Sequence, residues 1–336
     1  MPYRLIEGDP EPSAVRWLTF VPFLPDGRCM VLPGPRLPSG EVRAGEHYLL
    51  DACIRIPLET VGFRMQRVGP FAADRDHVYA WLDGDRYAGS RPHAVIEPVV
   101  DTAEALARVL DAVSAMVVRD GARAFRSQSD ADYYATNVRL LEPAYLRGTT
   151  VQAGSGFGGD AARWRARREM IVDGIDRAGT FLDVGCANGL LMESVRDWAA
   201  ERGLAIEPYG VDLAPGLVEL ARRRLPHWAD RIEVGNAIDY VPAGGRRFTF
   251  VHVLLDCVPV RRRGDMLRHA LDTLVAPGGR LLVSHYQSAG GGDRTAAEHV
   301  RDLGFEVAGS SHARGGDRAA TTAWIDRPAA MPVAPA

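Results

Sequence analysis

The stretch that decides the fold is Thr180-Phe181-Leu182-Asp183-Val184-Gly185-Cys186-Ala187-Asn188-Gly189. Thr180–Val184 has the apolar pattern of a strand, and Leu190 to Ala200 continues with a helical pattern. Glycines in the turn between them let the backbone approach a ligand closely, and the start of a helix offers N–H groups that the helix itself does not use. The stretch therefore predicts a strand, a turn that holds a nucleotide-containing cofactor, and a helix.

The residues that follow continue this alternation of strand and helix. Pro208–Asp212 is a second strand pattern, and it ends in an acid 23 residues after Gly189. A carboxylate at this point can accept hydrogen bonds from two adjacent ribose hydroxyls. Further strand patterns cover Arg231–Val234, Phe248–Leu255 and Arg280–Ser284, and helical patterns cover Gly216–Arg224 and Arg263–Leu274. Regular alternation of this kind predicts a parallel α/β sheet.

This ordered set of motifs resembles the class I S-adenosylmethionine-dependent methyltransferases over residues 160–328. The resemblance is carried by Asp183–Gly189, Asp212, Gly235-Asn236-Ala237, Asp256-Cys257-Val258-Pro259 and Pro277-Gly278-Gly279-Arg280-Leu281. It implies a Rossmann-like domain with a mostly parallel seven-stranded sheet. It also implies S-adenosyl-L-methionine as cofactor and methyl transfer as the reaction.

The same resemblance implies roles for individual residues. Gly185 and Gly189 would shape the loop around the methionine part of the cofactor, and Asp183 would steady that loop. Asp212 would hold the ribose, with Asn236 and Ala237 near the adenine. The implied cofactor-binding residues are Asp183, Gly185, Cys186, Ala187, Asn188, Gly189, Asp212, Leu213, Asn236 and Ala237. Ala187 stands where the family has its middle loop glycine, and Asn236 where many relatives carry an acid.

A nicotinamide-binding Rossmann domain is the rival interpretation of this turn. Its fingerprint places three glycines as G-x-G-x-x-G. Here the last glycine, Gly189, comes one residue earlier, and Asp183 stands two residues before the first. The turn Pro277-Gly278-Gly279 before a strand is also typical of methyltransferases. The pattern therefore favours the methyltransferase.

Polar residues follow two of the central strand patterns. Asp256 follows the fourth strand, and His285 with Tyr286 follows the fifth. Ligands of open α/β sheets bind beyond the carboxyl ends of the strands, so we expect these three residues to orient the acceptor or remove its proton. His285 is the favoured base because an ordinary imidazole titrates near neutrality. The alternatives are that Asp256 caps the next helix and that His285 is a half-buried residue bonded to a backbone carbonyl.

Other polar residues in this half receive weaker assignments. His252 alternates with apolar residues inside a strand pattern and is expected in the core. The segment from Asp256 to Pro259 lacks the Asn/Asp-Pro-Pro-aromatic pattern typical of nucleobase and protein amide N-methylation. Arg261-Arg262-Arg263 is expected to be a solvated helix start, although Arg261, Arg165 or Arg167 are candidates to hold an anionic acceptor.

Residues 122–159 are predicted to form a helical junction and lid between two domains. Ser127–Tyr145 has a helical pattern, and Gly154–Gly159 is expected to be a flexible loop. Phe157–Arg168 is expected to form part of a lid, with Gly158 and Gly159 as its hinge. The tail, residues 329–336, is expected to be disordered.

Residues 1–121 resemble Nudix hydrolases. The resemblance is carried by Leu37-Pro38-Ser39-Gly40, Gly45-Glu46 and Arg55–Phe63. Of the clustered acids that hold metal on a diphosphate in that family, only Glu59 remains, and Pro57 is expected to disrupt the helix. We therefore expect a small mixed α/β domain without hydrolytic activity, which binds or shields the acceptor or forms a dimer contact. The alternative is an unrelated mixed domain with strands at Val15–Phe23, Cys29–Leu32 and His77–Leu82.

The composition excludes several chemistries. All 40 basic residues among the 336 are Arg, so a P-loop, a protein kinase, and pyridoxal phosphate or Schiff-base chemistry are absent. A net charge of −3 gives no reason to expect nucleic acid as partner, and no apolar run is long enough to span a membrane. The four cysteines are scattered and the nine histidines show no ligand spacing, which predicts reduced thiols, no metal site and a cytoplasmic location.

The sequence thus predicts an enzyme that transfers a methyl group to an O or N atom of a small-molecule acceptor. Two alternatives stay open at this point. In the first, the cofactor domain only senses S-adenosylmethionine, and the front domain binds a regulatory ligand. In the second, the chain is bifunctional and also hydrolyses a diphosphate compound.

Overall fold

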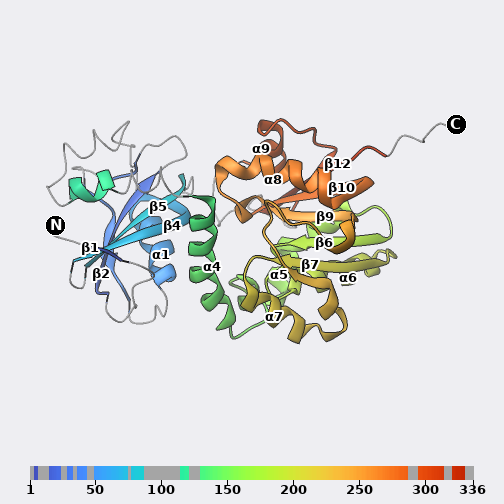
Figure 1. Cartoon of the computed structure of the whole chain (residues 1–336), viewed down its shortest axis with the longest axis horizontal. Coiled ribbons are helices and arrows are strands. Elements are labelled where there is room, and N and C mark those ends of the chain that lie inside the picture. The colour runs from blue at the N-terminus through green and yellow to red at the C-terminus, as the bar shows by residue number, and fades with distance from the viewer. Residues whose placement is uncertain are drawn as a thin grey trace. The chain divides into compact units, whose positions relative to one another are not determined.

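Two β-sheets, one in each half of the chain, organise the structure (Figure 1). The structure is a computed structural model that describes residues 4–6, 15–23, 29–32, 36–43, 49–74, 77–86, 114–120, 129–286, 294–313 and 320–329. The chain divides into a first unit, Met1–Leu141 with Gly290–Gly292, and a second unit, Glu142–Ala289 with Asp293–Ala336. The division falls inside helix α4 (Asp130–Leu146).

The first unit contains a five-stranded sheet in the order β1-β4-β5-β2-β3. The strands are β1 (Arg4–Ile6), β2 (Trp17–Phe23), β3 (Ser39–Glu41), β4 (Phe63–Asp74) and β5 (His77–Arg86). All neighbours are antiparallel except β2 and β5. The strands predicted at Val15–Phe23 and His77–Leu82 are confirmed. The segment Cys29–Leu32, also predicted as a strand, belongs to none of the strands of the sheet, and Leu32 forms an isolated β-bridge with Arg36.

Helix α1 (Leu49–Val61) runs through Pro57, so the prediction that this proline disrupts the helix was wrong. A proline inside a helix removes one hydrogen bond and costs about 3 kcal/mol, which burial of an apolar face can offset. Ala52, Cys53 and Ile56 on this helix are 0–1% exposed. The helix ends at Val61, where Gly62 adopts a φ of 62°.

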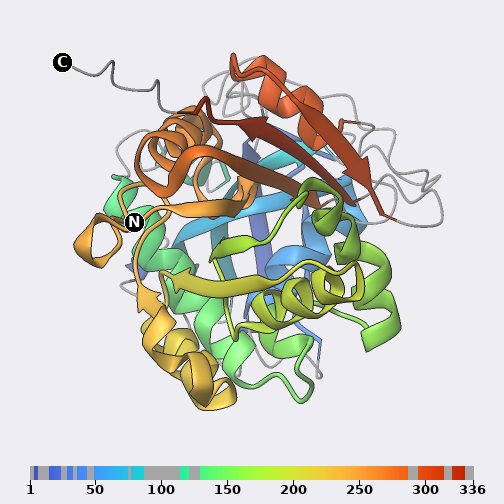
Figure 2. The ribbon, with the colours of Figure 1, turned by 90° about the vertical axis from the view of Figure 1, so that its right-hand side faces the viewer.

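The second unit contains a seven-stranded sheet in the order β11-β12-β10-β9-β6-β7-β8. The strands are β6 (Gly179–Val184), β7 (Ile206–Asp212), β8 (Ile232–Val234), β9 (Phe248–Leu254), β10 (Val275–Tyr286), β11 (Gly309–His312) and β12 (Ala320–Asp326). Strands β6 to β10 are parallel, and β12 runs antiparallel to both β10 and β11. The predicted mostly parallel seven-stranded sheet is therefore confirmed (Figure 2).

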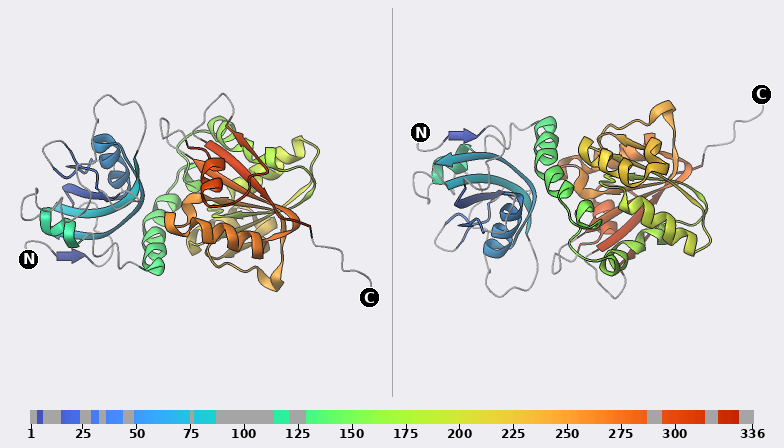
Figure 3. Two further views of the ribbon diagram at one scale, coloured as in Figure 1. Left: turned by 90° about the horizontal axis from the view of Figure 1, so that it is seen from above. Right: turned by 90° about the horizontal axis from the view of Figure 1, so that it is seen from below.

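Helices cover both faces of this sheet (Figure 3). They are α5 (Ala161–Arg168), α6 (Leu190–Glu201), α7 (Pro215–Arg224), α8 (Arg263–His269) and α9 (Ala296–Asp302). Phe181, Phe250 and Leu282 point to one face and pack in a core with Trp164 of α5 and Val195 of α6. The neighbouring side chains of each strand point to the opposite face. Among the described helices, none has the length and apolar character needed to cross a bilayer.

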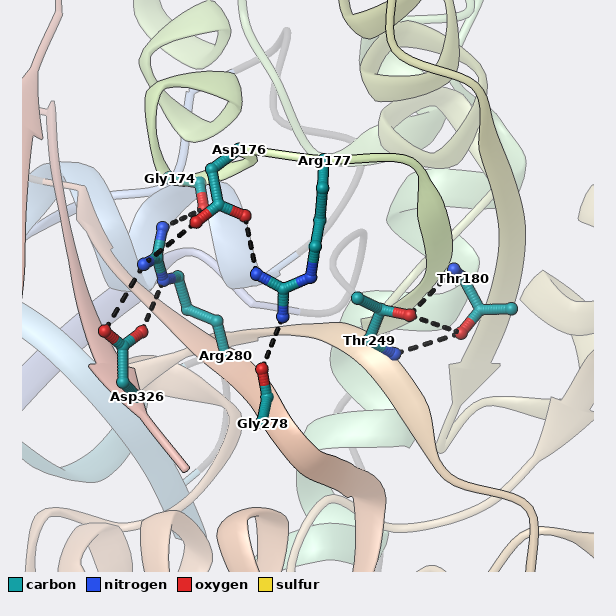
Figure 4. A network of polar contacts seen from close by, with 8 residues as sticks. All are labelled: Gly174, Asp176, Arg177, Thr180, Thr249, Gly278, Arg280 and Asp326. Atoms are coloured by element: carbon teal, nitrogen blue, oxygen red, sulfur yellow. Dashed lines mark hydrogen bonds and ion pairs between the residues drawn. The ribbon is translucent and has the colours of Figure 1, made fainter. Parts of the chain in front are cut away.

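Charged residues join three segments where β6 begins and β12 ends (Figure 4). Arg280 bonds Asp326 Oδ1 at 2.6 Å through its Nε, and its Nη2 lies 3.3 Å from Asp176 Oδ2. Its Nη1 donates to the carbonyl of Gly174 at 2.8 Å. Arg177 bonds Asp176 at 2.8 Å and also donates to the carbonyl of Gly278. This network joins the residues before β6 to β10 and to the end of β12. It lies at the edge of the sheet where β6 begins, opposite to the turn that follows β6.

Candidate functional site

The turn between β6 and α6 takes the shape that its glycines allow. Gly185 and Gly189 have φ angles of 85° and 76°, and a Cβ on Gly189 would lie 2.6 Å from Leu225 Cδ1. Ala187, with a φ of 46°, is the one non-glycine residue with a positive φ in the described part of the chain. The loop therefore keeps the backbone path of a glycine-rich turn although its middle residue has a side chain.

The backbone N–H groups of this turn are largely used inside the protein. Gly185 and Cys186 both donate to Val211 O, at 2.8 and 3.1 Å. Ala187 donates to Asp212 Oδ2 at 2.8 Å, and Gly189 donates to the carbonyl of Cys186. The amides of Gly185, Cys186 and Ala187 are thus taken by β7, and that of Gly189 by the turn itself. At the start of α6, Leu190 donates to Asn188 Oδ1, and ligand recognition by the N–H groups that follow stays a prediction.

Asp212 ends β7 beside this turn and is 9% exposed. Its Oδ2 accepts from the Ala187 amide and its Oδ1 from the Ala214 amide, at 2.8 and 2.9 Å. Each carboxylate oxygen can accept a second hydrogen bond, so the group stays available to a ligand hydroxyl. Burial raises the pKa of Asp212 above its ordinary value, and the two amides oppose that shift.

Asp183, the second acid of the site, is buried at the end of β6 and 2% exposed. Its Oδ1 lies 2.8 Å from Nδ1 of His252, which is 0% exposed and so confirms the expected core position of His252. Among the described residues, no hydrogen bond reaches the other oxygen, Oδ2, of Asp183. One carboxylate oxygen is thus held by the sheet, and the other makes no hydrogen bond among the described residues.

The other predicted cofactor residues divide between packing and the region after β8. The Asn188 side chain is 2% exposed; its Nδ2 donates to Val151 O at 2.8 Å and its Oδ1 accepts from the Leu190 amide at 3.1 Å. It therefore fastens the turn to the segment before α5. Leu213 and Asn236 are half-buried, and Ala237 is buried. Asn236 Oδ1 accepts one hydrogen bond, from the Ile238 amide at 3.3 Å.

The predicted catalytic residues lie on two faces of the sheet. His285 is 5% exposed and its ring stacks edge to face with that of His299 on α9, with 4.7 Å between centroids. Tyr286 points to the opposite face, because successive side chains of a strand alternate. There the guanidinium carbon of Arg168 lies 3.4 Å from the centroid of the Tyr286 ring. His285 and Tyr286 are therefore separated by the sheet.

Asp256 follows β9, where its carboxylate is 38% exposed. Arg263 of α8 bonds Asp256 Oδ1 at 3.0 Å and the carbonyl of Leu255 at 3.0 Å. Arg263 is 4% exposed. It does stand at the start of a helix, as predicted, but its side chain is buried, so the prediction that it is solvated was wrong. Cys257 lies next to the turn, since a Cβ on Gly185 would be 3.0 Å from its Sγ, and burial raises the pKa of Cys257 to about 12.

Tyr145 and Arg168, which were not among the predicted site residues, lie in the same region. Burial, followed by the charges of Asp212 and Cys257, raises the pKa of Tyr145, at the end of α4, to about 12. Arg168 lies within 5.3 Å of the ring centroids of Phe157 and Trp164, as well as over Tyr286. Among the described residues, no carboxylate pairs with Arg168. No sequence signal marks Tyr145, whereas Arg168 stands in the predicted lid.

The glycine-rich run before α5 is closely packed and not the loose loop that was expected. A Cβ on Gly154 would lie 2.8 Å from Asn188 Nδ2, and one on Gly156, whose φ is 71°, would overlap the ring of Tyr145. Only at Gly158, within this run, is there open space around the Cβ position. Arg165 is occupied by Glu169, at 2.9 Å, and by Glu201, which leaves it poorly suited to hold an acceptor.

Comparisons with known proteins find similarity in solved structures alone. No family model and no curated protein matches the chain. A 1,6-didemethyltoxoflavin-N1-methyltransferase from Burkholderia thailandensis, bound to 1,6-didemethyltoxoflavin and S-adenosylhomocysteine, is 19% identical, covers 60% of this chain and 91% of its own, and has a TM-score of 0.42. The glycopeptide N-methyltransferase MtfA is 17% identical over 51% and 92%, with a TM-score of 0.40.

A third structure, the [4+2]-cyclase SpnF, is 17% identical over 48% of this chain and 80% of its own, with a TM-score of 0.36. The similarity lies in the C-terminal half, and the Nudix-like identity of the front half stays a prediction. Since a shared fold hosts different reactions, the function has to be argued from the site.

Proposed function

We propose that the second unit is an S-adenosylmethionine-dependent methyltransferase that acts on an O or N atom of a small-molecule acceptor. The observation that carries the proposal is the polarity of the turn after β6. Two buried carboxylates, Asp183 and Asp212, face it, while the amides of Gly185, Cys186 and Ala187 are bonded within the protein. A dinucleotide brings its pyrophosphate against this turn and the helix start, and these three turn amides are already used. Carboxylates instead suit a ligand with ribose hydroxyls and an ammonium group.

The residues of the site fit S-adenosylmethionine part by part. Asp212, oriented by two backbone amides, accepts the ribose hydroxyls. The free oxygen of Asp183 accepts from the ammonium group, and Asn236 and Ala237 line the adenine end. Arg168, a cation without an acidic partner among the described residues, neutralises the carboxylate of the methionine part.

When bound, S-adenosylmethionine supplies a methyl group on a sulfonium centre that is already activated for in-line displacement. The protein then has mainly to hold and orient the acceptor. Asp256 is the best placed of the predicted catalytic residues, because its half-exposed carboxylate is fixed by Arg263 after β9. It orients the acceptor and, where the attacking atom carries a proton, accepts that proton.

Tyr286 has a different role from a base. Burial raises the pKa of Tyr286 above its ordinary value, so its hydroxyl stays protonated near neutral pH. It serves as a neutral group that packs against Arg168 and keeps that cation at the site. His285, on the α9 side of the sheet, stays a prediction as the base.

The first unit is proposed to have no hydrolytic activity. Glu59, the remaining acid of the Nudix-like motif, is paired with Arg43 at 3.0 Å and with Arg55 at 3.4 Å. Within the described ranges there is also no group of three or more His, Cys, Asp or Glu side chains that could hold a metal ion. The unit instead binds the acceptor or forms a dimer contact.

Methyl-labelled S-adenosylmethionine tests the reaction. The full chain is incubated with the label and with separate pools of small metabolites, proteins and nucleic acids. Label in the small-metabolite pool, reduced by Asp256→Asn with unchanged affinity for S-adenosylhomocysteine, supports the proposal. Binding of S-adenosylhomocysteine without label in any pool supports a sensor instead, and label in protein or nucleic acid contradicts the proposed acceptor class.

A further inference from the structure

Four buried polar side chains form a continuous hydrogen-bonded chain across the centre of the second sheet. Asp183 Oδ1 lies 2.8 Å from His252 Nδ1, and His252 Nε2 lies 3.0 Å from Ser284 Oγ. Ser284 Oγ lies 2.8 Å from Thr322 Oγ1. None of the four is more than 2% exposed. The chain crosses the strands β6, β9, β10 and β12 in that order.

Strand register brings these four residues to one face of the sheet. Asp183 pairs directly with His252 on the neighbouring parallel strand, and Ser284 pairs directly with Thr322. His252 pairs with Leu282, and Ser284 follows two residues later on the same face. A polar group buried without a partner costs free energy, so the four positions depend on one another.

The chemistry of the groups sets the direction of the hydrogen bonds. An ionised carboxylate only accepts, so Asp183 requires the His252 proton on Nδ1. In the neutral imidazole, Nε2 is then an acceptor, which Ser284 satisfies with its hydroxyl hydrogen. Ser284 in turn accepts from Thr322. The result is one directed path of three hydrogen bonds that ends on a single oxygen of Asp183.

The Ser284, His252 and Asp183 side chains have the order of a hydrolytic triad, but they cannot act as one. A nucleophilic serine has to reach the substrate, and Ser284 is 0% exposed with its oxygen bonded to Thr322. The hydrogen-bonded path can instead position Asp183, because it ends on this residue, beside the turn proposed to bind the cofactor. Asp183 is two residues before Gly185, whose amide is already taken by Val211 O.

We propose that His252 is a positioning residue for cofactor binding. It fixes one oxygen of Asp183, so the other oxygen faces the site in a single orientation. This inference rests on the proposed function, in which that second oxygen accepts from the ammonium group of S-adenosylmethionine. It predicts that the affinity for the cofactor depends on the hydrogen bond from His252 to Asp183. A side chain at position 252 that fills the space without this bond would not be enough.

Two amide substitutions separate these roles. The amide nitrogen of Asn can replace Nδ1 of His, whereas the amide of Gln replaces Nε2. His252→Asn therefore keeps the donor to Asp183 and loses the bond to Ser284, and His252→Gln does the reverse. Both replace a buried ring by a smaller amide, so both lower the thermal stability of the ligand-free chain. Affinity for S-adenosylhomocysteine is measured by calorimetry and the melting temperature without ligand.

We expect His252→Asn to bind S-adenosylhomocysteine within about threefold of the wild type and His252→Gln to bind at least about tenfold more weakly, since a hydrogen bond to a charged group is at stake. Equal affinity of the two variants, or losses that follow their melting temperatures, overturns the inference. If neither folds, Ser284→Ala takes their place: it removes the bond to His252 Nε2 but keeps the Nδ1 donor to Asp183, so binding within about threefold of the wild type is expected, and a loss of about tenfold or more overturns the inference. Failure of the wild type to bind overturns the proposed function itself.

Discussion

The carboxylate of Asp212 accepts a hydrogen bond of 2.8 Å from the backbone amide of Ala187. This bond joins the end of β7 to the middle of the turn after β6 and is formed while Ala187 holds a φ of 46°. The contact explains how alanine is accepted where a glycine would be expected. The buried carboxylate holds the turn in its left-handed conformation.

Ala187→Gly is expected to stabilise the protein slightly. A left-handed conformation costs a non-glycine residue about 1–2 kcal/mol, so glycine at this position relieves that strain. Glycine also has more freedom in the unfolded chain, which offsets the relief by about 0.4–1 kcal/mol. The net expectation is a gain of about 0–1.6 kcal/mol in the free energy of unfolding, measured by urea denaturation. Ala270→Gly, at a helical φ of −60° directly after α8, is the control and should destabilise. Equal destabilisation by both changes would show that Ala187 is not strained.

Gly189→Ala tests the close approach of the turn to α7. Gly189 has a φ of 76°, and a Cβ there would lie 2.6 Å from Leu225 Cδ1. Gly203 has a similar φ of 77° with nothing within 4 Å of the Cβ position. Gly203→Ala should therefore cost about 1 kcal/mol from backbone strain alone. Gly189→Ala should cost about 1–3 kcal/mol more from overpacking and should weaken cofactor binding, which thermal denaturation and calorimetry measure. Equal losses would rule out the steric contact.

Arg168→Met is expected to weaken binding of S-adenosylhomocysteine about 10- to 100-fold, because a hydrogen bond to a charged group is worth about 1.5–3 kcal/mol. 5′-Methylthioadenosine lacks the amino acid part, so its affinity should not change. The control is Arg165→Met, since that guanidinium is bonded to Glu169 and Glu201. A parallel loss of affinity for both ligands in Arg168→Met would place Arg168 away from the carboxylate.

Arg280→Lys should lower stability although the charge is kept. The guanidinium bonds both oxygens of Asp326 and also reaches Asp176 and Gly174 O, a geometry that an ammonium group cannot reproduce (Figure 4). The expected loss is about 1–2 kcal/mol in urea denaturation, since two or more charged hydrogen bonds are involved. Arg268→Lys, in an exposed pair with Asp265, should stay within about 0.5 kcal/mol of the wild type. If Arg280→Lys and Arg268→Lys changed the free energy of unfolding equally, the network around Arg280 would not contribute to stability.

Acid should destabilise the second unit through His299. Burial, followed by the charges of Arg263 and Arg294, lowers the pKa of His299 to about 4, from an ordinary 6.5. Between these values the unfolded chain binds a proton that the folded chain does not, so stability falls as the pH falls from 6.5 to 4. Because the ring is half-buried, solvent screening limits the loss to about 1–2 kcal/mol. His299→Gln should flatten this part of the pH–stability curve, and an unchanged slope would assign it to other groups.

Local pattern was enough to predict the five parallel strands of the second sheet and the helices α6, α7 and α8, whereas no range was predicted for β11, β12 or α9. Thr180–Val184, Leu190–Ala200 and Pro208–Asp212 agree with β6, α6 and β7 to within two residues, because each is an apolar run bounded by clear breakers. Asp212 was predicted from its place at the end of a strand pattern, where β7 does end, whereas Asp183 was named through the family resemblance. The opposite faces of His285 and Tyr286 also follow from the two-residue period of a strand.

The features that could not be predicted from the sequence depend on contacts between residues far apart in the chain. Nothing in the spacing indicates that Val211 O takes the amides of the turn, or that Tyr145 packs on Gly156. The helix through Pro57 is kept by burial of its apolar face, which a local rule for proline does not include. His252 was placed in the core, but its bonds to Asp183 and Ser284 require the strand order and register.

The cofactor specificity of the second unit is tested most directly by calorimetric titration of the full chain with S-adenosylhomocysteine and, separately, with NAD. The proposed site predicts binding of S-adenosylhomocysteine, no binding of NAD, and at least about a tenfold loss of affinity in Asp212→Asn, which keeps the shape of the side chain but removes its charge. Tight NAD binding, or no binding of S-adenosylhomocysteine by the wild-type chain, would contradict it.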